Sequence, residues 1–176
     1  STGNVFNSGS LVMALSDNNE TNQVNVAGTW GLASAPGDIF SGDLKIKNTG
    51  SVPANHIELK FTNTVTPAGS APGSTETDPL DRVIEITLFE WDSNGDGTTD
   101  LTIPIVDVNG NGIKDLEDLE IQAADDFDNL AFGGTQGADH ILRIEGRLNP
   151  TLAIDEHQGD SVSMNLDVTM NQDASQ

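Results

Sequence analysis

The chain has 176 residues and carries 28 Asp and Glu against 7 Lys and Arg, which gives a formal net charge of −21 at pH 7. Because so acidic a surface repels phosphate groups, nucleic acids and anionic membranes are not expected partners. The absence of cysteine excludes disulfides, thiolate metal sites and thiol nucleophiles. Hydrophobic residues make up 35% of the chain, which with 18 Gly is enough for a buried core in a single domain.

The beginning of the chain predicts an extended segment followed by short strands. Ser1–Asn7 reads as an extended piece with no adjacent partner, whereas Leu11–Leu15 alternates and reads as a strand. A polar turn over Asp17–Gln23 precedes another short strand that begins near Val24 and reaches Trp30. Because the chain begins with Ser rather than Met, we expect a mature form from which a leader was removed.

Two alternating runs form the centre of the sequence pattern. In 40–47 and 56–61, apolar and polar residues alternate with the period of two that is typical of half-buried strands. Between them, a segment containing Gly50 and Pro53 has the composition of a turn. A single pair of strands cannot bury its apolar face, so the remaining strands are expected to supply an opposing sheet.

The middle of the chain mixes loops with further strands. Residues 62–81 are rich in Thr, Pro, Gly and Ser and predict a long loop. Arg82–Trp91 is apolar on both faces and predicts a central strand. Leu101–Val106 predicts a short strand that Pro104 restricts to a sheet edge, and 113–124 predicts a short helix.

Two further alternating runs follow, at Asp139–Leu148 and Asp160–Met170. About eight short strands separated by turns indicate an all-β fold, an antiparallel β-sandwich of the jelly-roll type. We expect an N-terminal segment over 1–10 and a single domain over 11–176. No run approaches the ~20 apolar residues of a membrane span, so no such span is expected.

An acidic section over 90–128 holds 12 of the 28 acids, and Lys114 is its only basic residue. It contains two stretches with the spacing of calcium loops, in which oxygen-bearing side chains alternate and Gly occupies the sixth position. The expected ligands of the first loop are Asp92, Asn94, Asp96, Thr98 and Asp100; those of the second are Asp107, Asn109, Asn111, Ile113 through its backbone carbonyl, Asp115 and Asp118.

Calcium binding is the favoured interpretation of these loops, because unpaired acids at this density repel one another unless a cation neutralises them. The second loop carries a carboxylate at its twelfth position and resembles dockerin and EF-hand loops, whereas the first has Ile103 there and needs a ligand from elsewhere. The alternative is a pair of solvated turns built on Asp, Asn and Gly.

Two common catalytic motifs are absent from the sequence, whereas catalysis by a pair of carboxylates is left open as an alternative role of the acids. The sequence contains neither HExxH nor GxSxG, and no pair of carboxylates stands out as a glycosidase site. The three histidines, His56, His140 and His157, are scattered and are expected to be structural. Trp30 and Trp91 are expected to be core or edge anchors, with a sugar-binding platform left open.

Several segments, in order along the chain, resemble the TasA/camelysin family of secreted fibre proteins, which includes archaeal bundling pilins. They are VFNSGSLVMAL over 5–15, PGD over 36–38, LKIKNTGSVPA over 44–54, QGDSVSMNL over 158–166 and MNQ over 170–172. The acidic section does not follow the family pattern and looks like an insertion.

The resemblance implies a secreted jelly-roll subunit that polymerises with copies of itself into extracellular filaments of biofilm matrix, which associate in bundles. It implies that the N-terminal segment inserts as a donor strand into a groove of the next subunit. The expected donor residues are Ser1, Thr2, Gly3, Asn4, Val5, Phe6 and Asn7, with Val5 and Phe6 as anchors. The alternative is that this segment folds back on its own subunit or stays disordered.

Two other functions are compatible with the sequence. The same sandwich and loops suit a monomeric calcium-dependent adhesin or a carbohydrate-binding module. Camelysin-like proteins are often called metallopeptidases, but the lack of a zinc motif or an evident nucleophile favours a structural protein over an enzyme.

Overall fold

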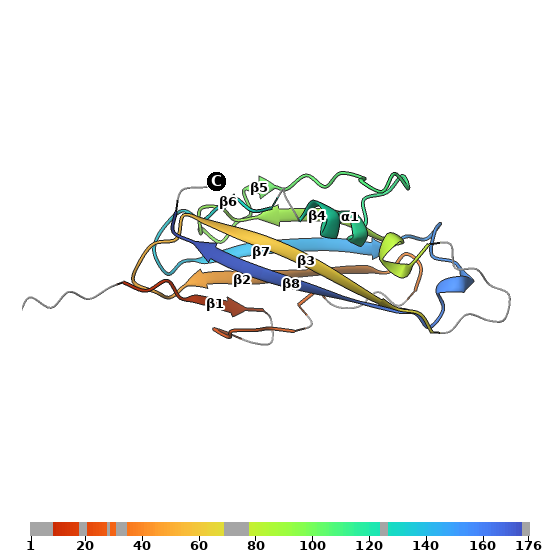
Figure 1. The fold of residues 1–176 in the computed structure, drawn as a ribbon, viewed down its shortest axis with the longest axis horizontal. Helices are drawn as coiled ribbons and strands as arrows, with labels where there is room; N and C mark the ends of the chain where they lie inside the picture. Colours follow the sequence, from red (N-terminus) through yellow and green to blue (C-terminus); the bar gives the residue numbers. More distant parts are fainter. Residues whose placement is uncertain are drawn as a thin grey trace, which may run out of the picture.

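The computed structural model describes residues 9–17, 21–27, 29–30, 35–68, 78–123 and 127–173. The chain forms two antiparallel β-sheets that pack face to face in an elongated sandwich (Figure 1). The sequence prediction of an all-β fold is confirmed at this level, whereas the jelly-roll assignment stays a prediction. Among the described residues, no helix is long and apolar enough to cross a membrane.

The larger sheet has five strands in the order β1-β2-β7-β4-β5, and the smaller sheet has three in the order β6-β3-β8. The five strands are β1 (Met13–Ser16), β2 (Ile39–Asn48), β7 (Asp139–Leu148), β4 (Ile84–Trp91) and β5 (Leu101–Thr102). The three are β6 (Leu130–Ala131), β3 (His56–Thr66) and β8 (Ser161–Asn171). The helical elements are η1 (Leu80–Arg82), α1 (Leu116–Gln122) and η2 (Asp155–His157).

The two central alternating runs lie in opposite sheets. β2 pairs with β1 and β7, whereas β3 pairs with β6 and β8. The turn between them therefore crosses from one sheet to the other and does not close a hairpin. Each strand buries the face that the alternation predicted, because Leu44 and Ile46 of β2 and Leu59 and Phe61 of β3 are all buried between the sheets.

Three predictions in the loop-rich parts were wrong, one of a loop and two of strands. Residues 62–66 belong to β3 and not to a loop, because β8 offers pairing partners along the whole length, from His56↔Asn171 to Thr66↔Ser161. The strand expected from Val24 onwards is limited to one bridge between Gln23 and Leu15. The strand expected over 101–106 ends at Thr102, two residues before Pro104.

β4 contains a β-bulge that its alternation does not reveal. Its register with β7 shifts between Ile86 and Leu88, so the inward positions change parity there. Ile84 and Ile86 before the bulge and Phe89 and Trp91 after it are all buried. The bulge therefore explains why both faces of this segment are apolar in sequence.

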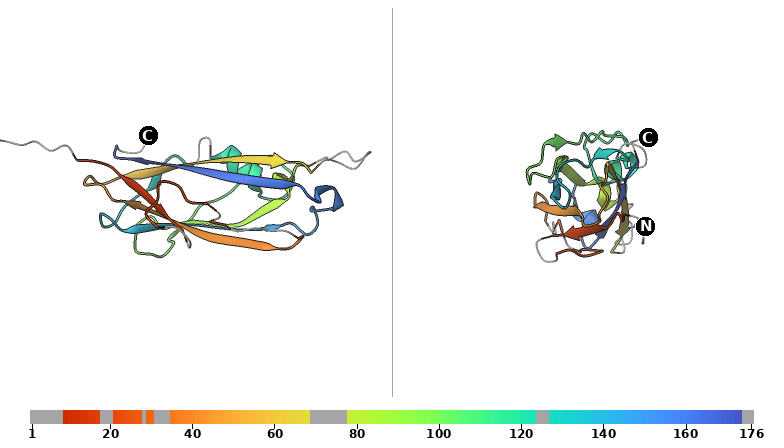
Figure 2. Two further views of the ribbon diagram at one scale, coloured as in Figure 1. Left: turned by 90° about the horizontal axis from the view of Figure 1, so that it is seen from below. Right: turned by 90° about the vertical axis from the view of Figure 1, so that its left-hand side faces the viewer.

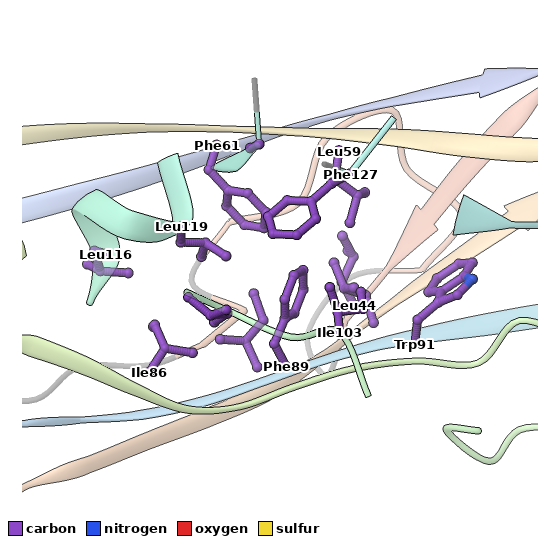
Figure 3. Packing of buried hydrophobic residues seen from close by; sticks show 14 of the residues in the cluster. Leu44, Leu59, Phe61, Ile86, Phe89, Trp91, Ile103, Leu116, Leu119 and Phe127 are labelled. Carbon is purple, nitrogen blue, oxygen red and sulfur yellow. The ribbon is translucent and has the colours of Figure 1, made fainter. Parts of the chain in front are cut away.

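The acidic section supplies part of the hydrophobic core. Leu119 of α1 is fully buried, Phe127 is 1% exposed, and Ile103 and Leu116 are buried in the same cluster. Phe127 packs edge-to-face against Phe61 of β3 and Phe89 of β4, with ring centroids 6.3 and 5.3 Å apart (Figure 3). The acidic section thus contributes side chains between the two sheets and closes one side of the sandwich.

Candidate subunit-binding groove and calcium loops

On the opposite side of the sandwich, β8 is the edge strand of its sheet over 11 residues in the part of the chain that the structure describes. β1, the edge of the larger sheet, lies on this same side, whereas β5, β6 and α1 lie on the other (Figure 1). A long edge strand carries unpaired backbone N–H and C=O groups and can pair with another chain.

The inner face of β8 is apolar but only half covered. Val162, Met164, Leu166 and Val168 point inward by alternation, yet each retains solvent exposure, and only Met170 is buried. The adjacent strand β3 differs over its first half, where the inward residues Ile57, Leu59 and Phe61 are between 0 and 2% exposed, whereas Val65 further along is half-buried like its partners on β8. The apolar contacts that would complete the burial of β8 are therefore missing from the described part of the subunit.

This half-covered face borders a groove of about 1420 Å³ between the two sheets. Part of its lining is formed by apolar residues of both sheets and of the segments around them, namely Leu15, Phe40, Leu44, Leu80, Ile84, Leu116, Val162, Met164 and Leu166. Polar residues of β8 and of the segment before it, among them Asp160, Asn165 and Asp167, also line it. Pockets for small molecules usually measure about 300–1000 Å³, so this groove is large for such a ligand. Its size and its sheet-edge border suit an extended peptide.

The described chain begins at one end of the long axis of the sandwich. The Ser10 carbonyl accepts hydrogen bonds from the backbone N–H groups of Ser51 (2.8 Å) and Val52 (3.2 Å), in the turn after β2. Gly50 is required there, since a Cβ at this position would lie 2.1 Å from the Ser10 carbonyl oxygen. The groove also borders η2 and the residues around it, at the other end of the molecule (Figures 1 and 2). The predicted donor residues 1–7 lie outside the described residues.

The second candidate calcium loop is folded around Asp107. One carboxylate oxygen accepts hydrogen bonds from the N–H groups of Gly110 (2.7 Å) and Asn111 (3.1 Å), and the other accepts from Gly112 (2.9 Å). Both glycines have positive φ, at 74° and 93°, which explains why only Gly suits these positions. The Ile113 N–H donates to the Asn111 side-chain oxygen (3.0 Å), which continues the turn.

The end of this loop is fixed to the first turn of α1. Asp115 is the N-cap and forms a capping box with Asp118, and both side chains are fully buried. The other Asp118 oxygen accepts hydrogen bonds from the N–H groups of Val108 (2.8 Å) and Asn109 (3.1 Å), so it joins the start of the loop to its end.

Asp115 is the most constrained carboxylate of this loop. Burial raises its pKa above the usual value, and hydrogen bonds from the Asp118 N–H and the amides of Asn109 and Asn111 oppose the increase. The two amide nitrogens lie 3.1 and 2.6 Å from one Asp115 oxygen. Three of the predicted ligands of the second loop, Asn109, Asn111 and Asp118, thus contact Asp115. The other two behave differently: the Asp107 carboxylate is held by backbone N–H groups, and the Ile113 N–H bonds to Asn111.

The first candidate loop has the same turn but a different ending. Asp92 is fully buried and accepts hydrogen bonds from Gly95 (2.7 Å) and Gly97 (2.9 Å). Asn94 accepts from the Asp96 N–H and Asp96 accepts from the Thr98 N–H, both at 2.9 Å.

Asp100 folds back on the start of this first loop. It accepts hydrogen bonds from the N–H and hydroxyl of Ser93. These hydrogen bonds lower the pKa of Asp100, and the Ser93 N–H has the largest effect. Ile103, at the twelfth position, is buried in the core and offers no side-chain ligand. The first loop is therefore the less complete of the two.

Within the described ranges, no three Asp, Glu or His side chains converge closely enough to hold a metal ion. A cation in the second loop would thus take part of its oxygens from Asn side chains and from a backbone carbonyl. Such a mixture of donors suits calcium, which accepts 6–8 oxygen ligands in flexible geometry.

One of the histidines and one of the tryptophans have the structural role that the sequence predicts. His140 is fully buried and stacks on Phe132, with ring centroids 3.7 Å apart, while its Nδ1 lies 2.8 Å from the Asp92 carbonyl oxygen. Trp91 is a core residue, and its indole N–H donates to the Ala131 carbonyl at 2.8 Å.

The family resemblance implied a groove, but the residues that line it were not predicted from the sequence. A signal for the groove was present, because the run 161–171 has the most regular alternation in the chain. Nothing in that pattern indicates that only one edge of the strand is paired. No family model matches this chain, and no curated protein matches it in sequence.

Proposed function

We propose that this protein is the structural subunit of an extracellular filament that grows when one copy donates an extended N-terminal segment to the groove of the next. The observation that carries the proposal is the open edge of β8 above an inner face that is apolar and half covered. A strand added at this edge would satisfy the free backbone groups and complete the burial of that face.

The proposed donor is Ser1–Asn7, in which Val5 and Phe6 are the only large apolar residues. The described chain starts at one end of the long axis, and the groove extends to residues at the other end. A donor that leaves one end of a copy and enters the next copy makes a head-to-tail contact, which does not close on itself and produces a filament. The resemblance to the TasA/camelysin family points to the same assembly, and with it to secretion and to bundles of filaments in a biofilm matrix.

We further propose that calcium stabilises each subunit through the second loop and, more weakly, through the first. The support is the arrangement of Asp107, Asp115 and Asp118 with two Asn side chains around one turn and one short helix. Because α1 also buries Leu116 and Leu119 in the core, a cation there would stabilise the fold as a whole.

Electron microscopy of the purified protein tests the filament proposal. The chain is compared with a full-length variant that carries Val5→Asn and Phe6→Asn, and with a control variant that carries Thr2→Asn and Ser8→Asn. We expect filaments from the parent and the control, and monomers from the first variant. Filaments from the variant with two substituted anchors would overturn the donor assignment.

The same preparation separates the alternatives. A parent chain that elutes as a monomer and forms no filaments with calcium favours an adhesin or a carbohydrate-binding module. Zinc-dependent cleavage of casein would favour a camelysin-like peptidase instead of the non-enzymatic role proposed for this chain.

A further inference from the structure

The connection between β1 and β2 enters the groove from its own subunit. Val26 and Trp30 are half-buried, pack against the core cluster and line the groove. Thr29, which precedes Trp30, also lines it. Part of the space beside β8 is thus occupied by a segment that belongs to neither sheet.

Gly42 of β2 makes room for this segment. It shares the inward face of β2 with Leu44 and Ile46, which are buried between the sheets. A Cβ on Gly42 would lie 1.9 Å from the Thr29 carbonyl oxygen and 3.1 Å from the Trp30 Cα. The backbone of residues 29–30 therefore lies directly on the inner face of β2, where a sandwich normally holds a core side chain.

The Trp30 side chain lacks one hydrogen bond. Its indole nitrogen is buried and finds no hydrogen-bond partner among the described residues. A buried donor without a partner is unfavourable, because it has given up its hydrogen bond to water. The backbone bonds nearest to this segment form one antiparallel pair, between Leu15 and Gln23, both at 2.8 Å. The Thr29 hydroxyl donates one further hydrogen bond, to the Asp17 carboxylate at 3.4 Å. The described contacts of this segment are thus few and local, and one buried donor without a partner weakens them.

We infer that Thr29 and Trp30 form an internal plug of the groove, which the donor segment of an incoming copy displaces. This inference rests on the proposed function. The plug covers the inner face of β2 in the free subunit and so limits contact of that face with water and with other proteins. Displacement returns the Trp30 indole N–H to solvent, where it can donate a hydrogen bond to water, so the cost of a buried donor without a partner disappears.

A fluorescence titration tests the plug. The protein is the full-length chain with Val5→Asn and Phe6→Asn, which cannot donate, and the probe is a synthetic peptide of residues 1–10. We expect peptide binding to shift the tryptophan emission to longer wavelength, and Trp30→Phe in the same background to abolish the shift. Trp91 serves as an internal reference, since it is fully buried in the core.

Gly42→Ala is the decisive variant, because its methyl group expels the plug from the inner face of β2. If the plug is seated in about nine of ten free subunits, its removal raises the apparent peptide affinity about tenfold. Ser41→Ala is the matched control on the outer face of the same strand and should leave the affinity unchanged. Trp30→Ala provides a second route, since it shortens the plug without adding a group to β2, and should also raise the affinity.

The outcomes separate the two proposals. Peptide binding with equal affinity to the parent, Gly42→Ala and Trp30→Ala chains, without a shift in emission, overturns the plug and leaves the filament proposal intact. Failure of the peptide to bind any of these folded chains overturns the filament proposal, and the plug with it.

Discussion

Truncating an inward side chain of β8 should affect the free subunit and the filament differently. Leu166 of β8 and Leu59 of β3 both point between the sheets, but Leu59 is 1% exposed whereas Leu166 is half-buried beside the groove. Leu→Ala at a fully buried site costs about 2–5 kcal/mol of unfolding free energy, so we expect that loss for Leu59→Ala. For Leu166→Ala we expect about 1 kcal/mol, because its side chain is only partly covered.

The remainder of the Leu166 contribution should appear in assembly. If a donor strand completes the burial of β8, Leu166→Ala loses about another 1 kcal/mol for each contact between subunits. Combining it with Met164→Ala should bring the loss to about 2 kcal/mol, or roughly a thirtyfold increase in the critical concentration for filament growth.

Two measurements are needed for this comparison. Urea unfolding of non-donating chains gives the subunit stability, and sedimentation of filaments against total concentration gives the critical concentration. The reasoning fails if Leu166→Ala destabilises the free subunit as much as Leu59→Ala does and leaves the critical concentration unchanged.

Three further predictions concern the acidic section and its surroundings. Calcium at a hundredfold excess over its Kd should stabilise the chain by about 2.7 kcal/mol, measured as a thermal shift. Asp118→Asn should remove most of this gain, whereas Asp139→Asn, at a half-buried carboxylate outside both loops, should leave it unchanged. Leu119→Ala, at a fully buried position of α1, should cost about 2–5 kcal/mol in urea unfolding, whereas a loss under 1 kcal/mol would show that the section does not belong to the core.

Burial, and then repulsion from Glu117, raises the pKa of Asp81. A carboxyl group whose pKa is raised in the folded state binds more protons there than in the unfolded chain, so stability falls as pH rises from about 4 through the folded pKa. Asp81→Asn should therefore be more stable than the parent at pH 7, and this difference should vanish near pH 3 in unfolding curves.

The sequence predicts strands well where alternation alone determines the inward face. Leu59 and Phe61 of β3 are inward and buried, and Leu44 and Ile46 of β2 are likewise. These positions depend on a local period of two, which each strand carries in its own sequence.

Features that depend on distant partners were not predictable in this way. Residues 62–66 were predicted as a loop because they begin a stretch rich in Thr, Pro, Gly and Ser, yet they are a strand that pairs with β8, and their Thr and Val residues favour strands. The bulge after Ile86 depends on how β4 meets β7, and the space over Gly42 depends on a segment that lies beyond the alternating pattern of β2. Each of these features depends on a tertiary contact that the local sequence pattern does not contain.

The candidate sites show the same division. The spacing of Asp, Asn and Gly in the second loop predicts its turn. The two glycines adopt positive φ, and the carboxylate at the first position accepts hydrogen bonds from their N–H groups. It does not predict that Leu119 and Phe127 from the same section complete the core. The period of 3.6 over so short a helix is too weak a signal for that purpose.

The way in which the acidic section covers one side of the sandwich would explain why the proposed filament grows without branching. The side of the sandwich next to β4 and β3 is covered by α1 and Phe127, and its edge strands, β5 and β6, have only two residues each. Edge strands this short leave much of β3 and β4 without a paired strand, but the acidic section occupies part of these edges: the Leu59 N–H donates to the Phe127 carbonyl (2.9 Å). On β4, the Ile86 N–H donates to the Lys114 carbonyl (2.7 Å), so fewer backbone groups remain for another chain. On the proposed mechanism, β8 is then the long edge through which a described subunit accepts a donor, and one N-terminal segment is available from each copy. One acceptor and one donor per subunit produce an unbranched chain, whereas a subunit with two long open edges would branch or form sheets.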